Sequence, residues 1–152
     1  MLYYDIYNYK DWQFLILVSD QGLRSLSLYD ESNLNHYVKD SARTKPYMDA
    51  VDRYFKGQPF NPNMALDLNG TPFEKRVWQA LMNVPYGQTK SYKKIAELIH
   101  NPRASQAVGN AVGKNPIMLV IPCHRIIKAN GTIGGFSSDI NLKIELLNIE
   151  RG

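Results

Sequence analysis

Four consecutive residues, Pro122-Cys123-His124-Arg125, have the composition of a reactive thiol site. Cys123 is the only cysteine of the 152-residue chain. The thiolate is the reactive form of cysteine, and a free thiol has a pKa of about 8.5, so reaction near neutral pH requires a basic or cationic neighbour. His124 is a basic neighbour of Cys123, and Arg125 is a cationic one. A lone cysteine is also often a buried structural residue, and these four residues alone leave that alternative open.

The apolar segment before the thiol is expected to position it. Residues 117–121 are Ile-Met-Leu-Val-Ile, and they lie between Pro116 and Pro122. A short apolar run of this kind predicts a buried strand that ends at Cys123. Beyond the thiol, residues 130–131 are Asn-Gly, which predicts a small hairpin next to the same site.

Two short helices before this segment predict a helix-turn-helix. The first begins at Ser91, and the second takes Asn101 as its cap and Pro102 as its first residue. The outer face of the second helix is small and polar with basic ends, so its backbone could approach DNA closely while basic groups meet phosphates. The candidate DNA contacts are Ser91, Arg103, Gln106, Ala107, Gly109 and Lys114. Many helix pairs are only packing units, so this pattern alone leaves that alternative open.

Two further helices complete the second half of the chain. Thr71 and Glu74 can form a capping box around Pro72, which suits the first helical position. A last helix over residues 139–150 is expected to bury apolar residues at helical spacing. Those residues are Ile140, Ile144 and Leu147.

The first half of the chain predicts a separate small unit. Residues 3–7, 11–18 and 23–29 have the pattern of an antiparallel meander, and Pro46 begins a helix with an apolar face. A proline-containing connector leads to a domain boundary at Asn69. No catalytic constellation occurs in this half.

The predicted fold class is therefore α+β. Residues 1–69 form an N-terminal domain with a small three-stranded antiparallel sheet and a helix. Residues 70–152 form a mostly helical, winged helix-turn-helix-like domain that carries the active-site cysteine.

Charge and cysteine usage limit the function classes. The net charge of +4 is unevenly placed, since residues 1–69 carry seven Lys/Arg against nine Asp/Glu and residues 70–152 carry eleven against five. A basic half favours a polyanionic partner. No apolar run of membrane-spanning length and no signal peptide are present, which predicts a cytoplasmic protein without a membrane partner. A single cysteine excludes an internal disulfide and a multi-cysteine zinc site, and neither a metal nor a cofactor is expected.

These motifs together resemble the O6-alkylguanine-DNA alkyltransferases, also called methylated-DNA–protein-cysteine methyltransferases. The resemblance rests on Asn115-Pro116, the segment 121–125, Ser91-Tyr92 and Gly109, and it covers Gly70 to Glu150 closely. The first half resembles the family's N-terminal domain in size and element order only. The resemblance implies DNA repair by direct reversal: one alkyl group moves irreversibly from O6-alkylguanine in double-stranded DNA to the protein. O4-alkylthymine is a second candidate substrate, and the protein is expected to act as a monomer.

The resemblance also implies catalytic roles. Cys123 would attack the alkyl carbon on guanine O6 and form a stable thioether, so each protein molecule would react once. His124 would act as the base through a bound water, and Glu150 would orient the imidazole. Tyr92 would donate a proton or hydrogen bond to the departing guanine.

Other residues would support these groups. Asn115 would hold the turn before the active-site segment, and Arg125 would be a structural pin beside Pro122 rather than a substrate group. The guanine pocket would be lined by Met118, Ile126, Phe136 and Ser137. Many family members have a tyrosine at the position of Phe136.

The DNA-facing helix departs from the family at one position. The target base must leave the duplex to react, and the resemblance places the second helix of the helix-turn-helix in the minor groove. The family fills the vacated base position with an arginine, where this chain has Gln106. A shorter, neutral side chain is expected to slow extrusion or weaken DNA affinity.

Three alternatives remain open at the level of sequence. One is a non-catalytic protein that recognises alkylated DNA, and the presence of Cys123 argues against it. The second is a winged-helix DNA-binding regulator without chemistry. The third is a thiol hydrolase or oxidoreductase that uses Cys123 and His124.

Overall fold

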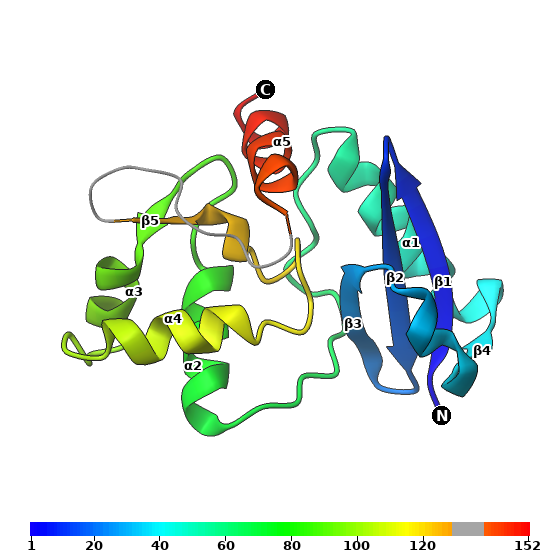
Figure 1. Ribbon diagram of the computed structural model, residues 1–152, viewed down its shortest axis with the longest axis horizontal. Coiled ribbons are helices and arrows are strands. Elements are labelled where there is room, and N and C mark those ends of the chain that lie inside the picture. The colour runs from blue at the N-terminus through cyan, green and yellow to red at the C-terminus, as the bar shows by residue number, and fades with distance from the viewer. Residues whose placement is uncertain (129–138) are drawn as a thin grey trace. The chain divides into compact units, whose positions relative to one another are not determined.

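The computed structural model describes residues 1–128 and 139–152, without the side chains of residues 32, 33 and 35. The chain divides into two compact units, Met1–Leu68 and Asn69–Gly152. Both contain helices and strands, so the predicted α+β class is confirmed (Figure 1). Among the described residues, no helix has the length and apolar character that a membrane crossing requires.

The first unit is a four-stranded sheet with one long helix. Its elements are β1 (Tyr3–Tyr9), β2 (Trp12–Ser19), β3 (Gly22–Leu28), the 3-10 helix η1 (Glu31–His36), β4 (Val38–Lys39) and α1 (Ser41–Phe55). The strand order is β3-β2-β1-β4, in which the first three strands form the predicted antiparallel meander. The sequence did not predict β4, a two-residue strand parallel to β1.

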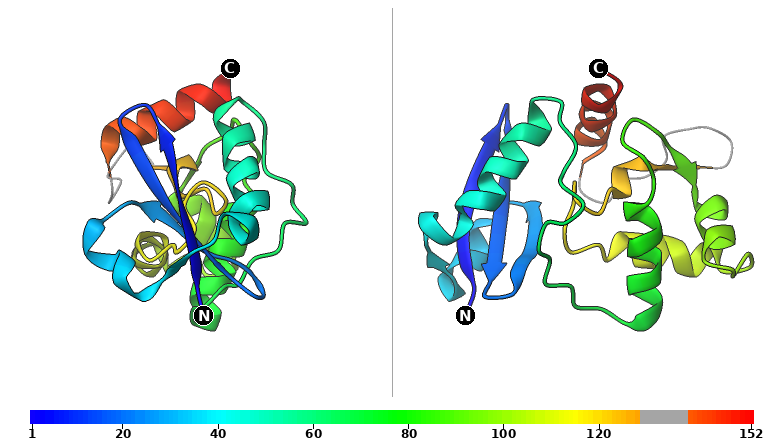
Figure 2. Two further views of the ribbon diagram at one scale, coloured as in Figure 1. Left: turned by 90° about the vertical axis from the view of Figure 1, so that its right-hand side faces the viewer. Right: turned by 180° about the vertical axis from the view of Figure 1, so that it is seen from behind.

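Aromatic packing joins α1 to the sheet. The helix lies across one face of β1 and β2 (Figures 1 and 2). Phe55 at its end stacks on Tyr9 with ring centroids 4.1 Å apart, and it also packs on Phe14, whose side chain is fully buried. Large buried aromatic rings contribute strongly to a small core.

The expected start of α1 at Pro46 is wrong by five residues. The helix begins at Ser41 because the Asp40 side chain accepts hydrogen bonds from the backbone N–H groups of Ala42 and Arg43. A carboxylate in this position satisfies donors that the first turn leaves unpaired. Pro46 lies inside the helix.

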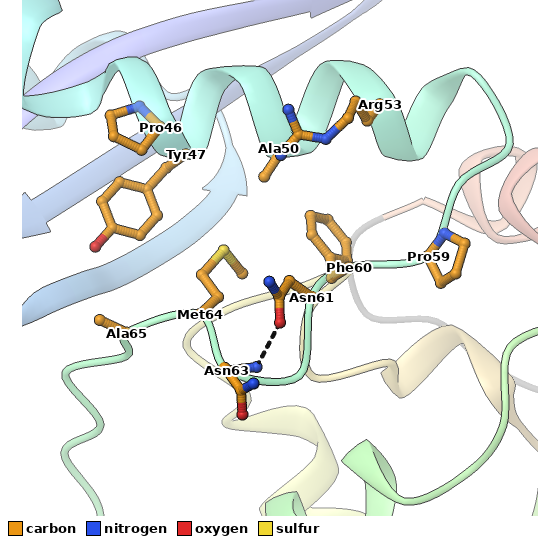
Figure 3. A pocket seen from close by; sticks show the side chains of 10 residues that line it. All are labelled: Pro46, Tyr47, Ala50, Arg53, Pro59, Phe60, Asn61, Asn63, Met64 and Ala65. Atoms are coloured by element: carbon orange, nitrogen blue, oxygen red, sulfur yellow. Dashed lines mark hydrogen bonds between the residues drawn. The ribbon is translucent and has the colours of Figure 1, made fainter.

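The connector after α1 folds back onto β3. Leu23 N donates to the Ala65 carbonyl oxygen at 3.0 Å, and Asp67 N donates to Leu23 O at 2.8 Å. Between this connector and α1 lies a surface pocket of about 470 Å³, with Tyr47 and Arg53 on the helix and Phe60 on the connector (Figure 3). The pocket belongs entirely to the first unit.

The second unit carries the predicted helix-turn-helix. Its elements are α2 (Pro72–Met82), β5 (Lys90–Ser91), α3 (Tyr92–Leu98), α4 (Ser105–Gly113), the 3-10 helix η2 (Cys123–Arg125), β6 (Ile126–Ile127) and α5 (Ile140–Arg151). Helix α2 packs on both α3 and α4, and the buried Trp78 Nε1 donates to the Ala111 carbonyl oxygen at 2.9 Å. The predicted capping box of Thr71 and Glu74 is present, and Ser91 caps α3 as expected.

Two helix predictions in this unit are wrong. Helix α4 begins at Ser105 rather than Pro102, because residues 101–104 form a turn in which Ala104 N donates to Asn101 O. On α5, Ile140 and Ile144 are 43% and 39% exposed. The buried face instead includes the charged residues Lys143 and Glu150, which apolar periodicity assigns to the surface.

We predict that Gly70→Ala destabilises the second unit. A Cβ at this position would lie 2.6 Å from the Trp78 ring, which is buried and hydrogen-bonded to α4. Forcing an atom into a packed core costs about 1–3 kcal/mol, so the urea midpoint should fall accordingly. Gly113→Ala is the matched control, because a Cβ there would meet nothing within 4 Å. Equal midpoints for the two variants would contradict the packing argument.

Candidate active site

Cys123 is held at the start of η2 by a run of tight turns. The expected strand over residues 117–121 is absent, because these residues bond to one another: Ile121 N donates to Ile117 O and Cys123 N to Ile121 O. The Asn115 side chain fixes the segment, since its Nδ2 donates to Ile121 O at 2.7 Å and its Oδ1 accepts from Ile117 N at 2.9 Å. The proposed role of Asn115 as the holder of this turn agrees with these two bonds.

The surroundings of the thiol favour its neutral form at rest. Cys123 is 8% exposed, and this burial raises the pKa of the thiol above its ordinary value. A hydrogen bond from Asn115, the positive charge of Lys143 and local backbone N–H groups oppose the shift. Ionisation of Cys123 in this site therefore needs a base that is already in place.

His124 and Glu150 form a buried pair next to the thiol. The Nε2 atom of His124 lies 2.5 Å from Oε2 of Glu150, and both side chains are 1% exposed. Burial lowers the pKa of His124 below its ordinary value of 6.5, while the Glu150 carboxylate opposes that change. The imidazole is thus neutral at rest. With Nε2 directed at Glu150, Nδ1 is the ring nitrogen that would accept a proton.

Arg125 completes the arrangement around Glu150. Its Nε donates to Oε1 at 2.7 Å and its Nη2 to Oε2 at 3.2 Å, which is a two-bond fork. The side chain is 9% exposed and points into the protein. Arginine forks of this kind fix a carboxylate in one orientation.

Tyr92 reaches the same site from the helix-turn-helix. It is the first residue of α3, directly after the cap Ser91. Burial raises the pKa of Tyr92, and a thiolate at Cys123 would raise it further, so its hydroxyl keeps its proton near the thiol. A tyrosine that remains protonated can donate to a leaving group.

Lys143 is a site residue whose role sequence reasoning did not identify. It is 1% exposed, and its Nζ donates to the Ile126 carbonyl oxygen at 2.5 Å. Burial lowers the pKa of Lys143, while a thiolate at Cys123 would oppose this change. A buried ammonium beside a thiol stabilises the thiolate form. Its position one turn after the cap Asp139 gives no sign of burial in the sequence.

Two of the four candidate pocket residues, Met118 and Ile126, lie in the described part of the chain. Met118 is 6% exposed and Ile126 is fully buried, and Pro122 is also buried next to Cys123. Phe136 and Ser137, together with the expected hairpin at residues 130–131, lie outside the described residues.

Most of the candidate DNA contacts are exposed, unlike the buried groups around Cys123. Arg103, Gln106, Ala107 and Lys114 are exposed on or beside α4. Gly109 is half-buried, and an added Cβ there would lie 4.0 Å from the Tyr92 ring. The remaining candidate, Ser91, uses its hydroxyl to accept from Lys94 N, and Lys114 Nζ lies 3.8 Å from a Glu74 carboxylate oxygen.

Comparison with known protein families matches both units. Residues 2–68 match the 6-O-methylguanine DNA methyltransferase, ribonuclease-like domain, and residues 72–152 match the 6-O-methylguanine DNA methyltransferase, DNA binding domain. A methylated-DNA–protein-cysteine methyltransferase of Mycobacterium tuberculosis is 42% identical over 130 residues, which cover 86% of this chain and 79% of the relative. The inducible methylated-DNA–protein-cysteine methyltransferase of Bacillus subtilis is 35% identical over 162 residues. This match covers 99% of the present chain and 90% of the relative.

Comparison with solved structures agrees. The fold matches the crystal structure of Mycobacterium tuberculosis OGT in complex with DNA with a TM-score of 0.89 and 36% identity. The match covers 98% of this chain and 92% of that chain. Both family models, the sequence relatives and the fold therefore confirm the predicted resemblance: the chain belongs to the 6-O-methylguanine DNA methyltransferase family.

Proposed function

We propose that this protein repairs DNA by transferring the alkyl group of O6-alkylguanine to Cys123, once per protein molecule. The observation that carries the proposal is the convergence of one buried thiol with a neutral His124 paired to Glu150. A neutral imidazole with an ionised partner behind it is the arrangement of a general base that activates a nucleophile. Double-stranded DNA with the alkylated base is the partner, and one copy of the chain suffices.

The reaction follows from these groups. His124 takes the thiol proton through a bound water, and Glu150 stabilises the imidazolium that forms. The sulfur of Cys123 then attacks the alkyl carbon as its bond to guanine O6 breaks, and Tyr92 donates a proton to the departing guanine. The proton held by His124 later replaces the one that Tyr92 gave. The products are a thioether on the protein and unmodified guanine in DNA, so no co-reactant is needed.

A titration with excess substrate tests the proposal. The protein is mixed with a several-fold excess of duplex that contains O6-methylguanine, and repaired guanine is counted by chromatography. We expect one repaired base per protein molecule and then no further reaction, because a thioether is not released. Continued turnover would contradict single use, and DNA binding without repair would support a recognition protein.

Base delivery is assigned to the exposed face of α4. The reacting atom lies inside the duplex, so the base must be extruded at a cost of a few kcal/mol. Arg103 and Lys114 flank this face and would meet phosphates, while Gln106 would occupy the space of the extruded base. A neutral glutamine contributes no attraction to the phosphate backbone.

We predict that Gln106→Arg tightens binding to DNA. The new guanidinium adds a charge on the DNA-facing helix, and one additional phosphate contact should improve the dissociation constant by roughly three- to tenfold at low salt. Fluorescence anisotropy at fixed salt measures the change. Gln58→Arg adds the same charge to an exposed site in the first unit and serves as the control. Equal or weaker binding by Gln106→Arg, or equal tightening by both variants, would contradict the assignment.

A further inference from the structure

A four-residue turn after α2 reaches the Arg125–Glu150 pair from far away in the sequence. Its residues, 84–87, are Val-Pro-Tyr-Gly, and we name this segment the 84–87 turn. We infer that the 84–87 turn is a positioning element for the thiol chemistry, because it fixes the carboxylate that orients His124. Its groups act through Arg125 and Glu150 rather than on the reacting atoms. The inference rests on the proposed function of Cys123 and His124.

The Glu150 carboxylate receives N–H groups on both oxygens. Oε1 accepts from Arg125 Nε at 2.7 Å and from the backbone N–H of Gly87 at 3.2 Å. Oε2 accepts from Arg125 Nη2 at 3.2 Å and lies 2.5 Å from His124 Nε2. Because two donors hold Oε1 in place, the orientation of Oε2 toward the imidazole is determined.

The N–H of Gly87 reaches Glu150 only with a special backbone conformation. Gly87 has φ of +83°, a region that residues with a side chain rarely adopt. A Cβ at this position would lie 3.1 Å from the backbone oxygen of Glu150. Glycine is therefore needed here both for the conformation and for the close approach.

Two other groups of the same turn hold Arg125. Its Nη1 donates to the Val84 carbonyl oxygen at 2.9 Å, and its guanidinium carbon lies 5.5 Å from the centre of the Tyr86 ring. The ring faces a cation that is largely removed from water, where cation–π attraction is strongest. The turn thus anchors one side of the guanidinium, which leaves Nε and Nη2 to form the fork on Glu150.

The expected effect of this positioning depends on pH. Burial disfavours the imidazolium that forms when His124 takes the thiol proton. The stability of this imidazolium therefore depends on a correctly placed Glu150. If the turn is loosened, less thiolate should form near neutral pH. At high pH, hydroxide ionises the thiol without His124, so the defect should shrink.

Alkylation of the thiol by iodoacetamide tests the inference without DNA. Cys123 is the only cysteine, so the gain in intact mass reports this thiol alone. We expect Tyr86→Leu to lower the rate of thiol alkylation about tenfold at pH 7 but by less than about twofold at pH 9.5. A loss of this size is typical when a group that orients a catalytic residue is removed. Tyr86→Phe keeps the ring and should retain the rate within about twofold. Tyr47→Leu, on α1 in the first unit, should change nothing.

Two results would overturn the inference. One is an equal loss of rate at both pH values, which indicates general disruption of the site. The other is a folded Tyr86→Leu variant with an unchanged rate at pH 7. Should Tyr86→Leu fail to fold, Arg125→Lys makes the same test, because a lysine cannot hold Val84 O and both oxygens of Glu150 at once. Wild-type protein that reacts with iodoacetamide but not with alkylated DNA would refute the proposed function and leave the positioning role standing.

Discussion

Cys123→Ser is expected to abolish alkyl transfer, with a fall in the single-turnover rate of at least about 10³-fold. A serine hydroxyl ionises at far higher pH than a thiol, and its oxygen is a much weaker nucleophile toward an alkyl carbon. The chain has no second cysteine that could take over. Repair of O6-methylguanine in a labelled duplex, followed after rapid mixing with excess protein, measures the effect.

The same variant separates chemistry from binding. Oxygen for sulfur is a small change in a site that is 8% exposed, so the fold and the exposed face of α4 should be preserved. We expect Cys123→Ser to bind the alkylated duplex with wild-type affinity in an anisotropy titration. Residual repair above one hundredth of the wild-type rate would show that another group accepts the alkyl group.

Glu150→Gln is expected to destabilise the protein by about 3–5 kcal/mol, because it leaves a buried cation without its counterion. Arg125 is 9% exposed and directs two N–H groups at the Glu150 oxygens, at 2.7 and 3.2 Å. A glutamine of the same shape keeps one acceptor and places an NH₂ group against other donors. Urea unfolding at pH 7.5, followed by tryptophan fluorescence, measures the loss.

Two controls identify the cause of this loss. Glu97→Gln removes an exposed carboxylate that lies 3.9 Å from Lys94 Nζ, and it should change stability by less than about 1 kcal/mol. The double variant Arg125→Met/Glu150→Gln also removes the buried guanidinium that Glu150→Gln leaves without a counterion. It should therefore be more stable than Glu150→Gln alone. A Glu150→Gln variant as stable as Glu97→Gln would contradict the buried ion pair.

Local signals in the sequence predicted the caps of α2 and α3 and the antiparallel meander. The hydrogen bonds of the capping box at Thr71 and of the Ser91 cap join residues that are only a few positions apart in the sequence. Such caps can therefore be identified from neighbouring residues alone. The antiparallel meander also follows from local turns. The resemblance to the family rests instead on residue motifs, chiefly Asn115-Pro116 and the segment 121–125.

The parts that sequence reasoning missed depend on contacts between distant residues. The apolar run 117–121 forms turns instead of a strand because the Asn115 side chain bonds the backbone at both ends of the run. Apolar periodicity also misses the burial of Lys143 and Glu150 on α5, whose charges find partners at β6 and η2, respectively. Only the family resemblance assigns Glu150 to the site. Periodicity treats a charged residue as exposed and cannot anticipate such partners.

The function of Gly87 is invisible for the same reason. A Pro-Tyr-Gly sequence after a helix predicts only a turn. Its N–H meets a carboxylate 63 residues further along the chain, and only the folded structure shows that the turn belongs to the active site.

The most direct test of the account is the site of modification. Wild-type protein is incubated with a duplex that contains O6-methylguanine, digested, and analysed by peptide mass spectrometry. The account predicts one added methyl group per molecule, located on Cys123, with complete restoration of guanine in the duplex. Repair without a methyl group on Cys123, or a methyl group on another residue, would contradict it.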